Sequence, residues 1–332
     1  MTLIEGDGIG PEVAAATTAV LDAAGARVEW ERMPAGQAAF AALGTALPDA
    51  TLDSLRRNRV GLKGPLGTQK GGGFRSANVG LRQALDLYVG WRPVARVPGV
   101  ATPYEAVDLV VLRENTEGLY AGIEHEVVPG VVVSLKVSSR AAALRIARWA
   151  FEHARQRGRR RITLVHKKAV LPLGDGAFVD AFFEVGRDYP FIEHDEQSLD
   201  RVCLALAEDP APYDVLLLEN LYGDIVSDLC AGLVGGLGVV PGANIGENVA
   251  VFEAVHGTAP DIAGQGLANP LAMLLSACLM LEWMGQETVA RAVRDAVTRV
   301  LEDGRVRTRD LGGSAGTDAL THAIVDALGA RR

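Results

Sequence analysis

Short apolar, β-rich runs alternate along this chain with stretches long enough to form helices, and this alternation limits the possible folds more than any other feature. The runs predict strands at residues 28–30, 60–63, 107–112, 162–165, 214–218 and 249–252. Between them, Pro11 opens a helical pattern that ends at Gly25, and further helical patterns cover residues 78–88 and 138–158. The alternation predicts an α/β protein in which helices cover parallel sheets.

The chain has the size of two ordinary domains or of one very large α/β domain, since its 332 residues compare with about 150 for a typical domain. Hydrophobic residues make up 48%, and 38 Gly and 15 Pro indicate frequent turns. This composition favours a large core and excludes wholesale disorder, collagen and coiled coil. A Pro-rich passage at residues 93–103 and a Gly-rich passage at 235–242 are candidate boundaries.

Charge and cysteine content argue against several classes of partner and location. The formal net charge is −8 and there is no long basic run, so neither nucleic acid nor an anionic membrane is an expected partner. The longest apolar run, residues 271–281, is shorter than the roughly 20 residues of a membrane helix. Cys203, Cys230 and Cys278 are far apart, which fits a reducing compartment. No signal or transit peptide fits before the turn at Gly6, so we expect a cytoplasmic location.

The turn at residues 6–12, Gly-Asp-Gly-Ile-Gly-Pro-Glu, lies between a short apolar run and a helix, where a dinucleotide-binding loop would lie. The Gly-x-Gly-x-x-Gly spacing fails, because Pro11 stands where the last glycine is needed and no suitably placed acidic residue follows. The turn therefore argues against a Rossmann fold. From its residues alone, a plain tight turn is an equally good interpretation.

A second Gly-rich segment, residues 63–78, allows close approach of the backbone to a ligand, and Ser76 and Asn78 near its end can donate hydrogen bonds. By itself, a flexible surface loop explains it as well. Arg82, Arg92 and Arg113 follow, the first on a predicted helix and the others beside strand-like segments. Guanidinium groups at such positions can hold carboxylates by paired hydrogen bonds.

Residues 220–228, Asn-Leu-Tyr-Gly-Asp-Ile-Val-Ser-Asp, give the sharpest local signal. If a helix begins near Asp224, then Asp224 and Asp228 lie one turn apart on the same face, where two carboxylates repel unless a cation lies between them. Oxygen ligands favour Mg²⁺ or Mn²⁺ over Zn²⁺. The alternative is that Asp224 caps the helix and Asp228 faces solvent. His256 also stands out, because a turn-rich Gly-Thr-Ala-Pro-Asp stretch follows it.

Taken together and in this order, these segments resemble the decarboxylating β-hydroxyacid dehydrogenases, the family of isocitrate and 3-isopropylmalate dehydrogenases. The resemblance covers essentially the whole chain and rests on residues 6–12, 63–93, 113–122, 220–228 and 256–264. It implies an α/β, two-domain, isopropylmalate dehydrogenase-like fold, not a Rossmann fold, with a cleft between the domains. We expect residues 1–98 and 240–332 to form a large cofactor-binding domain, and residues 99–239 a small domain with a metal site.

The resemblance also implies a homodimer whose active sites are shared between subunits. Residues 127–138 resemble the arm with which such enzymes clasp their partner. Lys167 and Asp200 would then act in the active site of the neighbouring subunit.

Substrate choice within the family depends on the loop before Asn78. Residues 75–78, Arg-Ser-Ala-Asn, resemble the isocitrate enzymes, in which the positions of Ser76 and Asn78 meet the third carboxylate of the substrate. The expected activity is oxidative decarboxylation of isocitrate, a tricarboxylate, to 2-oxoglutarate. The alternatives are a homoisocitrate, 3-isopropylmalate or tartrate-type dehydrogenase, and a non-catalytic regulatory subunit of a hetero-oligomeric isocitrate dehydrogenase.

The family mechanism assigns the remaining residues. Arginines would hold the substrate carboxylates, aspartates would bind Mg²⁺ or Mn²⁺, Lys167 would help remove the hydroxyl proton and Tyr120 would protonate the enol. The arginines are Arg82, Arg92 and Arg113, and the aspartates are Asp200, Asp224 and Asp228.

NAD is the expected cofactor. NADP-dependent relatives typically have a Lys-Tyr pair where this chain has Asp261 and Ile262, and an aspartate would repel a 2′-phosphate. The resemblance implies cofactor contacts from Thr68, His256, Gly257, Thr258, Ala259, Asp261, Ile262 and Asn269.

The chain departs from the family pattern at two places. Where many relatives have His-Lys-Ala-Asn, residues 166–169 read His-Lys-Lys-Ala, which removes an amide and places Lys168 beside Lys167. Trp91 stands where smaller apolar residues are common, and its indole would either narrow the pocket or fill the core.

Overall fold

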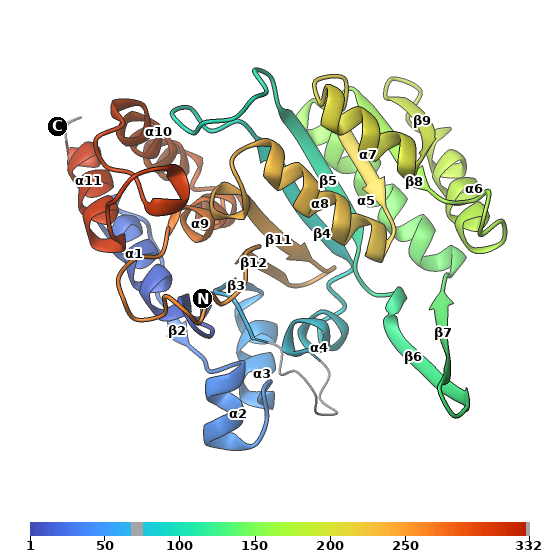
Figure 1. Cartoon of the computed structure of the whole chain (residues 1–332), viewed down its shortest axis with the longest axis horizontal. Helices are drawn as coiled ribbons and strands as arrows, with labels where there is room; N and C mark the ends of the chain where they lie inside the picture. The colour runs from blue at the N-terminus through green and yellow to red at the C-terminus, as the bar shows by residue number, and fades with distance from the viewer. Residues whose placement is uncertain (68–75, 330–332) are drawn as a thin grey trace. The chain divides into compact units, whose positions relative to one another are not determined.

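The computed structural model describes residues 1–67 and 76–329 (Figure 1). The chain divides into two compact units. Unit 1 comprises Met1–Leu85, Arg96–Pro103 and Val234–Arg332, and unit 2 comprises Asp86–Ala95 and Tyr104–Leu233. These bounds differ from the expected domains chiefly at residues 86–95, which belong to unit 2 because β4 (Val89–Ala95) pairs along its whole length with β5 (Asp108–Glu114).

Unit 1 contains a mixed sheet in the order β2 (Glu31–Arg32), β1 (Thr2–Ile4), β3 (Val60–Lys63), β12 (Ala250–Ala254) and β11 (Pro241–Ile245). Only β11 with β12 is antiparallel in this group. The helices of unit 1 are α1 (Gly10–Ala23), α2 (Gln37–Leu43), α3 (Asp49–Asn58), α4 (Ala77–Ala84), α9 (Leu271–Trp283), α10 (Glu287–Asp303) and α11 (Thr317–Gly329), with 3₁₀ turns η1 (Leu237–Val239) and η2 (Arg309–Leu311).

Helix α9 forms the centre of unit 1. Every residue of its apolar run 271–281 is buried, and the helix contacts strands β3, β11 and β12 together with helices α1 and α10. Helices α1 and α11, from opposite ends of the chain, pack side by side (Figure 1). The apolar run is therefore a core element, and among the described helices none has the length and apolarity that a membrane crossing requires.

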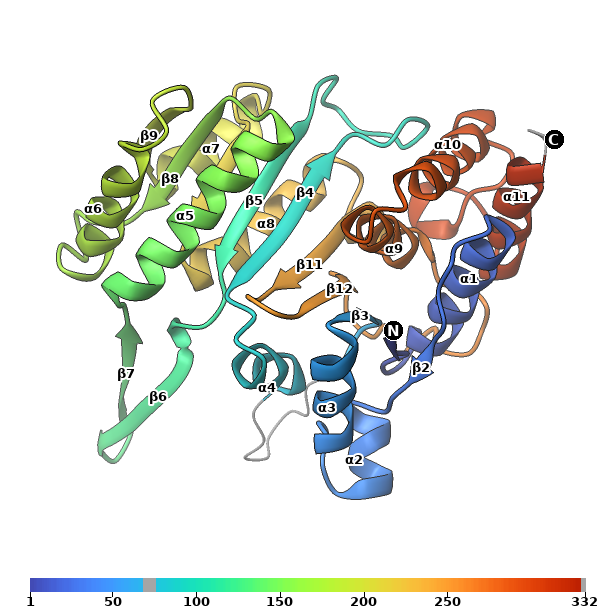
Figure 2. The ribbon, with the colours of Figure 1, turned by 180° about the vertical axis from the view of Figure 1, so that it is seen from behind.

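Unit 2 has a sheet in the order β4, β5, β10 (Val215–Leu218), β8 (Arg161–His166) and β9 (Glu193–Ser198), parallel except between β4 and β5. Helices α5 (Arg140–Arg157) and α6 (Gly174–Gly186) cover one face, seen from the front in Figure 2. Helices α7 (Leu199–Glu208) and α8 (Asn220–Leu233) cover the other face, seen from the front in Figure 1. Strands β6 (Gly118–Val128) and β7 (Val131–Val137) form a hairpin that projects from this unit, which we call the arm.

The α/β class and the non-Rossmann type are confirmed, as are most of the predicted strands. The strand predicted at residues 28–30 is wrong, because β1 begins at Thr2 and pairs with β2 only from Glu31 onward. The expectation of parallel sheets is also incomplete. Strands β4 and β11 are antiparallel to a neighbour, and the Gly and Pro residues within them weaken the β pattern.

Trp91 fills the core of unit 2, which confirms one of its two interpretations. Its ring is 4% exposed and lies edge-on to His153, at 5.1 Å between centroids, while Trp149 stacks on His153 at 4.7 Å. Burial in this aromatic cluster, with a smaller contribution from Arg157 and Arg159, lowers the pKa of His153 from 6.5 to about 4.

This shift predicts a pH-dependent stability. Between pH 6.5 and 4 the unfolded chain binds a proton that the folded chain excludes, so the free energy of unfolding decreases as the pH falls, by about 3 kcal/mol at 1.36 kcal/mol per unit. His153→Leu is expected to remove this part of the pH dependence. Urea unfolding of unaltered protein, His153→Leu and the control His322→Gln at several pH values is the measurement, and an equally steep decrease in all three would contradict the prediction.

Candidate active site

Helix α8 carries the pair of aspartates singled out in the sequence. It begins at Asn220, where the Gly223 amide donates to the Glu219 carbonyl at 2.8 Å, and not near Asp224 as expected. The helix follows β10 almost directly, so Asp224 lies in its second turn and is not a cap. The i, i+4 spacing still places Asp224 and Asp228 on one face. Burial and the charge of Asp224 raise the pKa of Asp228, as expected for two carboxylates on one face of a helix.

The side chain of Arg113, at the end of β5, contacts helix α8. Its guanidinium donates to Asn220 Oδ1 at 2.7 and 3.0 Å and forms an ion pair with Asp224. Gly223 makes the approach possible, since a Cβ at this position would lie 2.7 Å from the Arg113 side chain. Tyr120, on the arm, donates its hydroxyl to Asp224, and the guanidinium lies 4.8 Å from its ring centre.

Arg92, on β4, belongs to the same electrostatic environment, because its charge and that of Arg113 oppose the rise in the pKa of Asp228. Arg92 and Arg113 are each 3% exposed. Unit 2 therefore brings two buried guanidinium groups, a phenol and two carboxylates together. This arrangement can bind an anion and a cation side by side.

Lys167 and Asp200 form a second cluster in unit 2. Lys167 follows β8, Asp200 lies in the first turn of α7, and their side chains form an exposed ion pair. In the described part of the chain, no three His, Cys, Asp or Glu residues are grouped so that they could hold a metal. A single chain therefore does not join Asp200 to Asp224 and Asp228.

The remaining predicted substrate residues lie in unit 1. Asn78 and Arg82 are on α4, and Ser76 lies just before it. The Oδ1 atom of Asn78 is buried and has no partner among residues 1–67 and 76–329. Arg82 contacts Glu253 at 3.4 Å, and Glu253 also pairs with the buried Lys63 at 2.9 Å. Thr68 and Arg75 lie outside the described residues.

Most of the predicted cofactor residues line one cavity of unit 1, of about 430 Å³, within the range of about 300–1,000 Å³ that is typical of ligand pockets. The predicted residues at its wall are His256, Gly257, Ala259, Ile262 and Asn269. Burial lowers the pKa of His256, and its Nε2 atom is buried without a partner in the described chain. Thr258 and Asp261 are not among the lining residues.

The structure adds residues that sequence reasoning missed. Arg309 and Asp310 also line the cavity, and Asn269 donates to Asp310 at 2.8 Å while its Oδ1 accepts the first amide of α9. The 6–12 turn contacts the loop that carries His256 and Thr258. The Ile9 amide donates to the Thr258 carbonyl at 2.9 Å, and a Cβ at Gly8 would collide with this carbonyl. No local pattern identified these contacts, which join segments far apart in the sequence.

Comparison with known proteins agrees with this arrangement. A family model described as isocitrate/isopropylmalate dehydrogenase matches residues 1–328. The chain belongs to this family.

The similar proteins include enzymes and subunits of several kinds. A mitochondrial NAD isocitrate dehydrogenase catalytic subunit 5 of Arabidopsis thaliana is 48% identical over 98% of this chain and 88% of its own length. A mitochondrial regulatory subunit of the NAD isocitrate dehydrogenase of Dictyostelium discoideum is 45% identical over 99% and 92%. The crystal structure of isocitrate dehydrogenase from Methylococcus capsulatus superposes with a TM-score of 0.95, at 48% identity over 98% of both chains.

Proposed function

We propose that this protein catalyses the oxidative decarboxylation of isocitrate to 2-oxoglutarate with NAD and a divalent metal. The observation that carries the proposal is the cluster of Arg92, Arg113, Tyr120, Asp224 and Asp228 in unit 2 of a member of this family. Relatives whose names state NAD-dependent isocitrate dehydrogenase activity support the choice of substrate and cofactor.

Substrate binding is assigned to guanidinium groups and to the start of α4. Arg82, Arg92 and Arg113 hold the substrate carboxylates, for which their planar forks are suited. The Ser76 hydroxyl and the Asn78 Nδ2 group, both of which can donate hydrogen bonds, are assigned to the third carboxylate, which distinguishes isocitrate from apolar analogues. A site built to satisfy such groups discriminates strongly against a substrate that leaves them unpaired.

The carboxylates of Asp224 and Asp228, with Asp200 of a second protomer, are assigned to Mg²⁺ or Mn²⁺. The donor set fits, since it consists of oxygens and the two α8 carboxylates repel one another without a cation. When bound, the metal lowers the pKa of the substrate hydroxyl and stabilises the negative charge that develops as CO₂ leaves.

Two side chains are assigned to proton transfer. Lys167 removes the proton of the substrate hydroxyl, and Tyr120 donates a proton to the enol after CO₂ has left. A phenol with the ordinary pKa of 10 is already protonated at neutral pH, and burial and the nearby Asp224 raise the pKa of Tyr120 further, so its hydroxyl carries a proton that it can donate.

The cavity beside His256 is assigned to NAD. The His256 Nε2 atom, which has no partner among the described residues, and the amide of Asn269 offer polar contacts in a largely apolar wall. When bound, the nicotinamide accepts the hydride that leaves the substrate carbon. Asp261 disfavours a 2′-phosphate by charge repulsion.

Cofactor preference can be tested by exchange of two residues. In Asp261→Lys/Ile262→Tyr the ratio of kcat/KM for NADP over NAD is expected to increase about tenfold or more, equivalent to about 1.4 kcal/mol, because repulsion of the 2′-phosphate becomes attraction. Asp318→Lys, an equal change of charge on α11, serves as the control. A ratio that stays constant in both variants would argue against the assigned role of Asp261.

We further propose a homodimer with shared active sites and a cytoplasmic location. The arm supports the first, because Val127, Val128 and Val131–Val133 are between 42% and 62% exposed and need an apolar partner. Sedimentation is expected to give twice the mass of the chain, and a monomer would overturn this. The relatives from Arabidopsis thaliana and Dictyostelium discoideum are mitochondrial, so cell fractionation tests the location, and enrichment in an organelle would overturn it.

The test of activity is NADH formation from isocitrate, with Mn²⁺ and with EDTA in its place. We expect turnover that EDTA abolishes and that favours isocitrate over homoisocitrate, 3-isopropylmalate and tartrate. A tenfold preference for homoisocitrate, about 1.4 kcal/mol of transition-state binding, would overturn the choice of substrate. A chain that forms no NADH but accelerates a catalytic relative would be a regulatory subunit.

A further inference from the structure

Lys136, near the end of β7 in the arm, is held between the carboxylates of Asp175 and Glu219. Its ammonium contacts Asp175 Oδ1, lies 2.8 Å from Glu219 Oε2 and is 4.9 Å from the ring centre of Tyr222. The side chains are 15% exposed for Lys136, 14% for Glu219 and 3% for Asp175. We call these four residues the Lys136 cluster. It joins the arm, the start of α6 and the junction between β10 and α8.

The charges of this cluster depend on one another. Burial alone would lower the pKa of Lys136, but hydrogen bonds with Asp175 and Glu219 outweigh burial and raise it, so the ammonium remains charged. Burial raises the pKa of Glu219, which Lys136 opposes. A buried charge that loses its partner is strongly unfavourable, so each member keeps the others in place.

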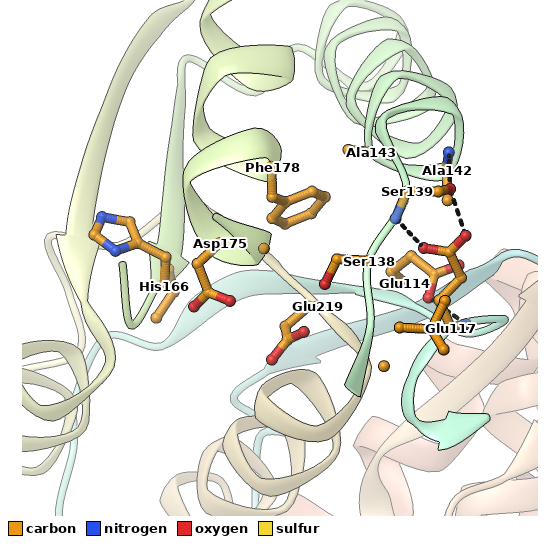
Figure 3. Close-up of a pocket in the computed structure, with 14 residues that line it drawn as sticks. Glu114, Glu117, Ser138, Ser139, Ala142, Ala143, His166, Asp175, Phe178 and Glu219 are labelled. Atoms are coloured by element: carbon orange, nitrogen blue, oxygen red, sulfur yellow. Dashed lines mark hydrogen bonds between the residues drawn. The ribbon is translucent and has the colours of Figure 1, made fainter. Parts of the chain in front are cut away.

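The cluster borders a cavity of about 30 Å³, in which Figure 3 shows the carboxyl groups of Asp175 and Glu219 near Ser138 and His166. A volume of this size holds a water molecule or two and excludes a substrate.

Asp175 connects the cluster to Lys167. While its Oδ1 atom contacts Lys136, its Oδ2 atom accepts the backbone amide of Lys167 at 2.6 Å. The Lys167 carbonyl then accepts the amides of Val170 and Leu171, which begins the turn that leads into α6. Asp175 thus determines where the chain carrying Lys167 leaves β8.

Glu219 connects the cluster to helix α8. Its carbonyl accepts the Gly223 amide in the first turn of this helix, and Asp224 follows directly. One ammonium on the arm therefore contacts the two acidic residues that fix the chain beside Lys167 and before Asp224.

We propose that Lys136 is a positioning residue: through Asp175 and Glu219 it ties the placement of Lys167 and of the first turn of α8 to the position of the arm. The proposal rests on the function proposed above, in which Lys167 transfers a proton. It makes catalysis sensitive to how the arm is held, and hence to the second protomer that would cover its exposed valines.

The test compares Lys136→Met, Lys136→Arg and Asp175→Asn with Arg140→Met, which removes an exposed ion pair with Glu184 on the neighbouring helices. We expect Lys136→Met and Asp175→Asn to lower kcat about 10- to 100-fold, the effect of misplacing a reacting group by about 1 Å, while KM for isocitrate changes less than about threefold. Lys136→Arg should recover most of the lost rate, and Arg140→Met should behave as unaltered protein.

The double variant Lys136→Met/Asp175→Asn should be no slower than the slower single variant, because Lys136→Met alone already breaks the contact with Asp175 that Asp175→Asn weakens. The proposal would be overturned if the two losses of kcat multiplied in the double variant. It would also be overturned if a single variant increased KM without a decrease in kcat, or kept kcat within twofold of the unaltered protein. Asp175→Asn preserves shape, so it tests the idea even where Lys136→Met fails to fold.

A second readout separates this proposal from the proposed function. Hydrogen exchange at the Lys167 amide, measured by mass spectrometry on a peptide covering residues 163–172, should become about tenfold faster or more in Lys136→Met and remain unchanged in Arg140→Met. This measurement requires no turnover. If unaltered protein forms no NADH from isocitrate, the function fails while exchange still decides the inference, and unchanged exchange in Lys136→Met overturns it.

Discussion

Replacement of Lys167 by Met is expected to lower kcat with isocitrate by between about 100- and 10,000-fold, the range found for loss of a positioned acid or base. The substrate hydroxyl would lose the group to which removal of its proton is assigned, whereas the arginines proposed to bind its carboxylates would remain. KM for isocitrate should therefore change little. Steady-state NADH formation at saturating Mn²⁺ is the measurement.

Lys168→Met is a closely matched control, because the same side chain is removed one residue further along. The two ammonium groups have different partners: Lys167 pairs with Asp200 on α7, and Lys168 pairs with Glu196 on β9. Lys168 is thus engaged with the sheet of its own unit, and its replacement should change kcat less than about threefold. Equal decreases of kcat in both variants, or a larger decrease in Lys168→Met, would show that Lys167 is not the residue that transfers the proton.

Local spacing was enough to predict the parts of the site that lie within one element. Asp224 and Asp228 share a face whether the helix begins at Asn220 or four residues later, because their relation depends only on helical periodicity. In the same way, the helical pattern at residues 138–158 predicted helix α5, which the structure contains at Arg140–Arg157.

Contacts between distant segments could not be predicted in this way. Lys136 and Asp175 are 39 residues apart, and Arg113 and Asn220 are 107 apart, so no periodicity relates them. Their pairing depends on strand order, which the sequence pattern left open. The polar edge strand β9 escaped prediction for a related reason, since its residues 193–198 carry no apolar alternation and form a strand only because β8 pairs with them.

The predicted roles of residues in the site also depend on a second chain. Within the described residues Asp200 lies with Lys167 and apart from Asp224, so the expected metal site requires a neighbour to complete it. The family resemblance implied that active sites are shared between subunits. The separation of Asp200 from Asp224 within one chain is consistent with this. Mixed dimers of two inactive variants test this sharing.

Asp224→Asn is expected to lower kcat by about 100-fold or more, because a bound metal contributes several kcal/mol of charge stabilisation and each 1.36 kcal/mol is tenfold in rate. The affinity for Mn²⁺, measured by calorimetric titration without turnover, should decrease as well. Asp180→Asn, which removes an exposed carboxylate of α6, is the control and should change neither quantity.

Mixing Asp224→Asn with Lys167→Met tests whether sites are shared. If each site takes Asp224 from one protomer and Lys167 from the other, a mixed dimer has one site with both defects and one with neither. Random reassociation makes about half of the dimers mixed, so about a quarter of the unaltered activity should return from two nearly inactive proteins. If each site instead used both residues of one chain, every site would carry one defect and no activity would return, which would refute the shared site.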